Sequence, residues 1–182
     1  TNAYDPHPLA AVAQKDDELF DVVDEQDQVL RQATRKEVHD NGLIHRAVHV
    51  LVFNKKHDCL LQQRSLLKDR HPGVWDSSAA GHLDAGEDYD TAARRELEEE
   101  LGITDTKIIR LGTLPPSEET GMEHVALYAA LYNGRVHFPA SEISGVVPFP
   151  AALIDRWLAA RPQDFANSFA ACWQIARTML GE

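Results

Sequence analysis

The stretch from Gly81 to Ile103 constrains the fold more than any other part of the chain, and it reads GHLDAGEDYDTAARRELEEELGI. Thr91 to Leu101 consists mostly of good helix formers. Gly102 stands where the C-terminal end of a helix favours a residue that adopts positive φ. We therefore predict a helix over residues 91–101, preceded by a loop that begins at Gly81.

This predicted helix carries three glutamates on one face. Glu96, Glu99 and Glu100 fall within an arc of about 100°, because positions i, i+3 and i+4 are neighbours on a helix, whereas Glu98 points away. Like charges so close repel each other, and a hard divalent cation such as Mg²⁺ or Mn²⁺ reverses that effect by binding the oxygen atoms. A solvated acidic face is the ordinary interpretation of such a pattern alone, but the fixed residues around it favour a metal site.

The acidic composition narrows the range of partners. A chain of 182 residues is long enough for one domain with a substantial core. The net charge of −11 argues against binding to a nucleic acid polymer or an anionic membrane. It still permits a small phosphate-bearing ligand, because a bound metal supplies positive charge.

The cysteines and the hydropathy predict where the protein works. Cys59 and Cys172 lie far apart in the sequence, which suggests free thiols in a reducing compartment. The sequence shows no signal peptide and no apolar run long enough to span a membrane. We therefore expect a soluble, cytoplasmic protein.

The remaining segments predict a mixed sheet flanked by helices. We expect a flexible N-terminal arm over residues 1–17 and a single domain over 18–182. The spacing Thr34 to Glu37 matches a capping box and predicts a short helix. Helical spacing recurs over 151–160 and 164–180, and β-like runs occur at 19–23, 29–32, 47–53, 59–63, 107–114, 124–132 and 146–149. The pattern predicts an α+β fold, an αβα sandwich with a mixed β-sheet between helices.

The stretch 81–103 resembles the signature of the Nudix hydrolases at every fixed position. These positions are Gly81, Glu87 after five residues and, after seven more, Arg95-Glu96-Leu97-x-Glu99-Glu100-x-Gly102-Ile103. The resemblance implies the sandwich fold and a Mg²⁺- or Mn²⁺-dependent hydrolase that acts on a nucleoside diphosphate linked to another group. It also implies a small-molecule diphosphate partner and a possible homodimer.

A wider region, residues 45–103, resembles the core of type I isopentenyl diphosphate isomerase, which shares the Nudix fold. The matching segments are HRAVHVLVFN, LLQQRSLLK and PGVWDSSAAGH. Two departures favour hydrolysis. Ala80 replaces the catalytic cysteine of the isomerase, and a methyl group cannot transfer a proton. The isomerase keeps only the last helix glutamate, Glu100, whereas this chain has all three, as metal-assisted attack of water on a diphosphate requires. An isomerase-like enzyme and a non-catalytic Nudix-fold binding module are the alternatives.

The resemblance, joined to the spacing, assigns roles to the residues of this signature. The three helix glutamates are expected to bind the metal, with the carbonyl oxygen of Gly81 as a further ligand. Either Glu99 or Glu100 is expected to act as general base, and their spacing does not choose between them. Arg95 is expected to orient Glu87 or Glu99, and Glu87 to support the site or reach the metal through water.

Basic residues and histidines outside the box complete the expected site. Arg64 and Lys68 align with the residues that hold the diphosphate in the isomerase, although simple surface charge is the alternative. The isomerase also binds a second metal. Its ligands correspond here to His82 and His45 in register, to His39 after a one-residue gap, and to the neighbourhood of Glu123; imidazoles mixed with a carboxylate suit Zn²⁺ or Mn²⁺.

Overall fold

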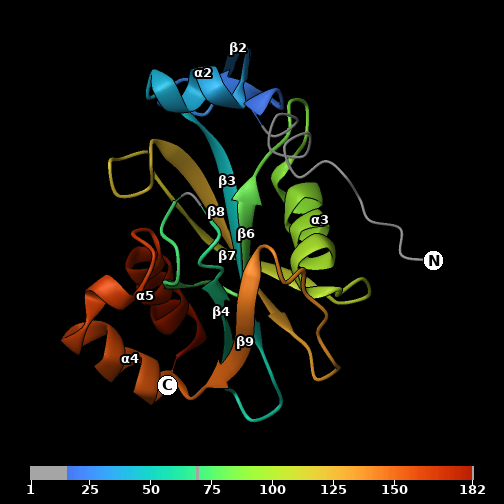
Figure 1. Ribbon diagram of the computed structural model, residues 1–182, viewed down its shortest axis with the longest axis vertical. Coiled ribbons are helices and arrows are strands. Elements are labelled where there is room, and N and C mark those ends of the chain that lie inside the picture. The colour runs from blue at the N-terminus through green and yellow to red at the C-terminus, as the bar shows by residue number, and fades with distance from the viewer. Residues whose placement is uncertain (1–15, 69, 182) are drawn as a thin grey trace.

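A mixed β-sheet forms the centre of the computed structural model, which describes residues 16–68 and 70–181 (Figure 1). Its strand order is β5-β4-β3-β8-β7, with β6 paired to β3 and β9 paired to β4. β3 and β8 run parallel, and the other pairs of named strands within the described residues run antiparallel. The strands are β3 (His45–Phe53), β4 (Cys59–Arg64), β5 (Trp75–Asp76), β6 (Ala79–His82), β7 (Ile108–Leu114), β8 (Glu123–Leu131) and β9 (Ile143–Phe149).

Helices cover both faces of this sheet because the side chains of its central strand alternate. Val48 and Val50 of β3 pack with Leu97 on one face, against α3 (Tyr89–Leu101). Ala47 and Leu51 pack on the other face, against α5 (Phe169–Leu180). Helix α4 (Ala151–Ala160) and a 3₁₀ turn (Pro162–Asp164) complete that second layer, and Figure 1 shows α3 and the α4/α5 pair on opposite sides of the sheet. The predicted αβα sandwich is therefore confirmed.

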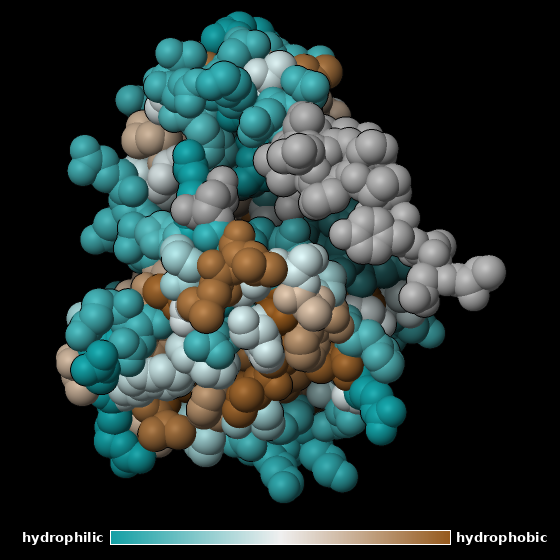
Figure 2. Space-filling view, in the orientation of Figure 1, coloured by the Kyte–Doolittle hydropathy of each residue, from teal (hydrophilic) through white to brown (hydrophobic). Residues whose placement is uncertain are grey.

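A separate small unit closes one end of the sheet. The hairpin of β1 (Leu19–Val23) and β2 (Val29–Thr34) leads into α2 (Arg35–Asp40). The predicted cap is present, because the Thr34 hydroxyl accepts a hydrogen bond from the Glu37 amide at 3.2 Å. Phe20, Val22, Ala33 and Val38 form the core of this unit. It is the hydrophilic end of the molecule in Figure 2, while hydrophobic residues gather over the lower half of that face.

Several predicted boundaries differ from the structure, and two of the differences lie beside the glutamates of α3. Helix α3 begins at Tyr89 rather than at Thr91, because the side chain of Asp88 caps it by accepting a hydrogen bond from the Thr91 amide at 2.7 Å. Gly81 lies on strand β6, where it pairs with Val48, and not in a loop.

The predicted helix over 164–180 is wrong at its start. Phe165 instead forms a parallel bridge with Trp75, and the Ala166 amide donates to the Trp75 carbonyl oxygen at 2.8 Å. This pairing holds the backbone extended, so α5 begins only at Phe169. Of the predicted N-terminal arm, residues 1–15 lie outside the described part of the chain.

Both cysteines are free, as predicted, and both are buried. None of the helices within residues 16–68 and 70–181 is long and apolar enough to cross a lipid bilayer.

Candidate active site

Strand β6 and helix α3 bring the predicted metal-binding glutamates together. A Cβ atom on Gly81 would lie 2.2 Å from Oε1 of Glu96, so that only glycine leaves room for this carboxylate. Glu100, one turn later, accepts hydrogen bonds from the Ala80 amide at 2.9 Å and from Nε2 of Gln62 at 3.1 Å. Glu99 is exposed at the rim of the same cavity. All three carboxylates therefore reach one space beside β6.

Arg95 ties these carboxylates to the loop between β6 and α3. Its Nε and Nη2 atoms each donate to Glu87 at 2.8 Å, which makes a bidentate pair. Nη1 donates to Glu96 at 2.7 Å and to Glu99 at 3.2 Å, and Nη2 also donates to the His82 carbonyl oxygen at 2.9 Å. Arg95 thus contacts both of the residues that it was expected to orient. Burial opposes ionisation of Glu87, but Arg95 outweighs it and lowers the pKa of Glu87 below its usual value.

Burial makes the carboxyl groups of Glu96 and Glu100 costly to ionise in the absence of a cation. It raises the pKa of Glu100 well above its ordinary value, and the charge of Glu96 raises it further. Burial also raises the pKa of Glu96, against the lowering effect of Arg95. A divalent cation would offset the repulsion between the two groups. This set of hard oxygen donors, in the space that the missing side chain of Gly81 leaves, fits Mg²⁺ or Mn²⁺.

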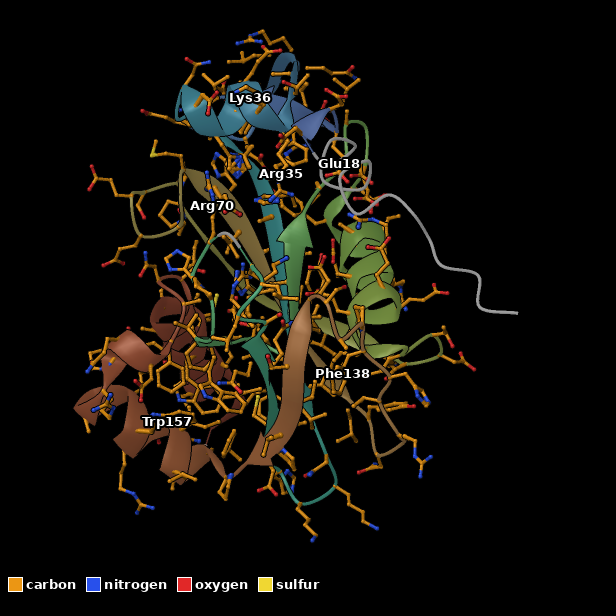
Figure 3. The ribbon with its side chains drawn as sticks, viewed as in Figure 1. Glu18, Arg35, Lys36, Arg70, Phe138 and Trp157 are labelled. Atoms are coloured by element: carbon orange, nitrogen blue, oxygen red, sulfur yellow. The ribbon has the colours of Figure 1, made fainter. Side chains whose placement is uncertain are left out.

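Basic residues line the same carboxylate cavity, the space of about 310 Å³ into which the three helix glutamates point. Arg64 donates through Nε and Nη2 to the carbonyl oxygen of Arg70, and its Nη1 atom makes no hydrogen bond among the described residues. Lys68 forms an ion pair with Glu142. Arg35 and Glu18 also belong to the wall and lie beside each other below α2 in Figure 3.

The predicted histidines form a second cluster near β6. His39, His45 and His82 place their candidate ligand atoms within 4.8 Å of one another. Nδ1 of His39 lies 3.1 Å from the Arg35 carbonyl oxygen, and Nδ1 of His45 lies 2.8 Å from the Leu43 carbonyl oxygen. These bonds require a proton on Nδ1, so in the neutral form of each ring Nε2 carries a lone pair.

One nitrogen of this imidazole cluster has no partner. Nε2 of His45 is buried and makes no hydrogen bond within the described structure. The half-buried carboxylate of Glu123 lies 4.0 Å from that nitrogen and 3.7 Å from Nε2 of His82. Burial lowers the pKa of His39 to about 4, and it lowers the pKa of His45 as well. Three imidazoles around an unpaired nitrogen, with one carboxylate, fit a transition metal such as Zn²⁺ or Mn²⁺.

The two clusters lie on opposite faces of the sheet. Gly81 pairs with Val48, which faces α3, whereas His82 pairs with Ala47, which faces α5. Directly paired residues project to the same side, and successive residues alternate. The helix glutamates therefore approach β6 from one side and the imidazoles from the other.

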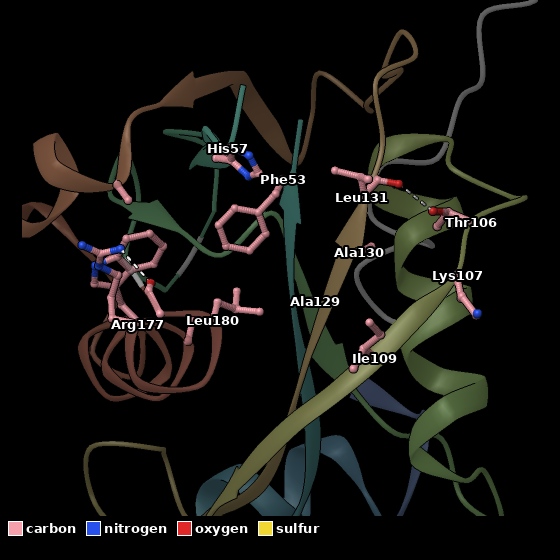
Figure 4. Close-up of a pocket in the computed structure, with 14 residues that line it drawn as sticks. Phe53, His57, Thr106, Lys107, Ile109, Ala129, Ala130, Leu131, Arg177 and Leu180 are labelled. Atoms are coloured by element: carbon pink, nitrogen blue, oxygen red, sulfur yellow. Dashed lines mark hydrogen bonds between the residues drawn. The ribbon is translucent and has the colours of Figure 1, made fainter. Parts of the chain in front are cut away.

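A larger cavity lies away from both clusters. Its volume is about 630 Å³, and its lining is mainly apolar, with Phe53, Ile109, Leu131 and Leu180 among its residues (Figure 4). None of the predicted site residues belongs to its wall, as far as the structure describes the chain.

Several supporting residues escaped the sequence-based prediction. Gln62 bonds Glu100, Glu142 pairs with Lys68, and Phe20 stacks on His45 with a centroid distance of 5.9 Å. Of these three residues, only Gln62 had a signal in the sequence, because it is a polar residue at an inward-facing position of an apolar strand.

The sandwich and its glutamate-bearing helix after a glycine define the class of this protein. The chain matches the NUDIX domain over residues 43–167, and it belongs to the Nudix family.

Individual relatives agree with this assignment. The chain is 39% identical to an uncharacterised Nudix hydrolase of Pseudomonas aeruginosa over 75% of its own length and 80% of the relative. It is 38% identical to isopentenyl-diphosphate Delta-isomerase 2 of Photorhabdus laumondii over 48% and 49% of the two chains.

Solved structures share the fold. The crystal structure of DR0079 from Deinococcus radiodurans superposes with a TM-score of 0.75 at 25% identity, covering 86% of this chain and 98% of that one. The NUDIX domain of Shewanella oneidensis NrtR, in complex with ADP ribose, superposes with a TM-score of 0.61 at 20% identity and covers 82% and 100%.

Proposed function

We propose that this chain is a Mg²⁺- or Mn²⁺-dependent diphosphohydrolase. Its substrate is a nucleoside diphosphate joined to a second group, X. The observation that carries the proposal is the convergence of Glu96, Glu99 and Glu100 on one cavity beside Gly81, whose missing side chain makes room for Glu96. ADP ribose, the ligand of the NrtR domain, is a compound of this kind.

The residues of the carboxylate cavity have separate roles in hydrolysis. The three helix glutamates and the Gly81 carbonyl oxygen would hold the cation, which when bound polarises phosphoryl oxygens and makes water more acidic. Nη1 of Arg64 and the ammonium group of Lys68 would contact the diphosphate. Arg95 holds Glu87 and Glu99 in place through its hydrogen bonds.

The reaction forms one bond and breaks one. The water oxygen bonds to a phosphorus atom, the bridging P–O bond breaks, and each product keeps a phosphate. Either Glu99 or Glu100 accepts the proton of the water. Both oxygen atoms of Glu100 already accept hydrogen bonds, whereas Glu99 is exposed on the cavity side and bonds only Arg95 among the hydrogen bonds of the described residues.

A second metal ion is the other part of this proposal. The buried, unpaired Nε2 of His45, together with His39, His82 and Glu123, supports a Zn²⁺ or Mn²⁺ site on the α5 side of β6. Its role would be structural or substrate-positioning. The isomerase-like alternative has no proton-transferring side chain at Ala80, which occupies β6 beside this cluster.

Hydrolysis in ¹⁸O-labelled water tests the proposal. The purified protein is incubated with a panel of nucleoside diphosphate-linked compounds in Mg²⁺, in Mn²⁺ and in EDTA. We expect turnover only with metal, and label in one phosphate-bearing product. Measurable Mg²⁺ binding without turnover of any compound would instead support a non-catalytic binding module.

A further inference from the structure

A second polar cavity adjoins the carboxylate cavity across β6. Its volume is about 300 Å³. His49, Asp76 and Ser168 line it on the α5 side, and its wall also includes His39, His82 and Glu123 of the imidazole cluster. The two cavities share Arg64 and the β6 residues Ala80, Gly81 and His82. A ligand whose diphosphate lies beside Arg64 can therefore extend from the glutamates into this polar cavity.

Buried polar side chains form the inner wall of the polar cavity. His49 and Asp76 are only 6% and 7% exposed, yet both line it. Nδ1 of His49 bonds the Ser77 hydroxyl at 2.8 Å, which fixes the ring. Its Nε2 lies 3.3 Å from the Ser168 hydroxyl, at the long end of the range for a hydrogen bond. A ligand hydroxyl can improve on that weak contact, because it both donates and accepts.

The opposite wall adds further hydrogen-bonding groups. The loop before β8 contributes Glu118, Glu119 and Thr120, and Asn167 stands beside Ser168. Among the described residues that line the polar cavity, the only rings are imidazoles, and none is Phe, Tyr or Trp. An apolar or aromatic group would strip water from these polar groups without replacing its hydrogen bonds, which is unfavourable. A hydroxyl-rich group would replace them.

We propose that the polar cavity binds X, the group on the far side of the diphosphate, and that X is a hydroxyl-rich, non-aromatic group such as a sugar or polyol. His49 and Ser168 determine this specificity through Nε2 and the hydroxyl group. The inference rests on the diphosphohydrolase proposed above, and it names the substrate class of that site.

Binding of uncleavable diphosphonates tests the polar cavity apart from catalysis. Three methylenediphosphonate esters are compared by calorimetry in Mg²⁺: glucosyl, cyclohexyl and phenyl. Glucosyl and cyclohexyl match in ring size and differ in the hydroxyl groups. We expect the wild type to bind the glucosyl ester about tenfold or more tightly than the other two, since several hydrogen bonds of modest individual strength add up.

Two variants test whether His49 and Ser168 cause the preference for the glucosyl ester. His49→Gln and Ser168→Ala should each weaken glucosyl binding about fivefold and leave cyclohexyl binding within about twofold. His124→Gln is the matched control, because His124 bonds the Asp24 carbonyl oxygen and lies outside both cavities. Ser168→Ala removes only a half-buried hydroxyl, so it keeps the test valid if His49→Gln unfolds.

The outcomes separate this inference from the proposed function. Hydroxyl-dependent binding that both variants weaken supports the sugar site even if no compound is hydrolysed. Equal binding of the three esters, tighter binding of the phenyl or cyclohexyl ester, or equal losses for all three in the variants overturns it, even if metal-dependent hydrolysis is observed.

Discussion

Gly81 shows how a single missing side chain shapes this site. The carboxylate of Glu96 occupies the place that a Cβ atom on residue 81 would need. The added methyl group of Gly81→Ala would displace the carboxylate at the end of the flexible Glu96 side chain. The fold should therefore persist while this carboxylate moves. We expect Mg²⁺ affinity and kcat each to fall about tenfold or more, since small displacements of catalytic groups have large effects. Metal titration and steady-state kinetics measure both.

Gly145→Ala is the matched control for this substitution. Gly145 lies on β9 without positive φ, and nothing stands within 4 Å of the position of a Cβ atom there. Its kinetics should equal those of the wild type. Unchanged Mg²⁺ affinity in Gly81→Ala would show that Glu96 is not a ligand.

Glu98, Glu99 and Glu100, the successive glutamates at the end of α3, differ in their surroundings. Glu99→Gln and Glu100→Gln should each reduce kcat about 100-fold, or about 3 kcal/mol in the barrier, because each removes a metal ligand or the general base. Glu98→Gln should have no effect, since Glu98 is exposed and outside the carboxylate cavity. Steady-state kinetics of the three variants provide the comparison. A similar loss at residue 98 would contradict the assignment of the helix face.

At the scale of elements, one arginine joins α3 to β6 and to the intervening loop. Arg95 bonds Glu87, Glu96, Glu99 and the His82 carbonyl oxygen at once. Arg95→Lys keeps the charge but loses the planar fork. We expect the free energy of unfolding to fall by about 1–3 kcal/mol and Mg²⁺ binding to weaken, because the carboxylates lose their partner.

Urea denaturation and Mg²⁺ titration measure these effects. Arg94→Lys is the neighbouring control, since the side chain of Arg94 is exposed and bonds the Thr106 carbonyl oxygen. Equal stability and equal Mg²⁺ affinity in the two variants would mean that the Arg95 network does not organise the site.

At the scale of the whole molecule, the sheet separates the cluster of helix glutamates from the imidazole cluster. Glu96, Glu99 and Glu100 gather on its α3 side, and the three imidazoles with Glu123 gather on its α5 side, with β6 between them. We expect protein purified without added metal to carry about one equivalent of Zn²⁺ or Mn²⁺, bound by the imidazole cluster. The double variant His45→Ala/His82→Ala should lose it.

Elemental analysis of the purified proteins decides this prediction. His124→Ala should retain the metal, since that histidine bonds the Asp24 carbonyl oxygen elsewhere. Equal transition-metal content in the wild type and the double variant, or none in either, would leave the histidines with structural roles only.

The sequence by itself determined the features that depend on neighbours along the chain. The period of the helix placed Glu96, Glu99 and Glu100 on one face and Glu98 off it. The cap at Thr34 and the strands of the hairpin and the sheet followed from local patterns in the same way. These interactions span a few residues, so the order of residues suffices to predict them.

Only the tertiary structure decided what depends on pairing between distant segments. The register of β6 against β3 sent Gly81 and His82 to opposite faces of the sheet. Contact between Trp75 and Phe165 overrode helical spacing and delayed the start of α5. The meeting of His49 with Ser168 likewise joins segments 119 residues apart. Such contacts depend on how whole elements pack, and packing energy is shared over many residues that no local pattern of the sequence records.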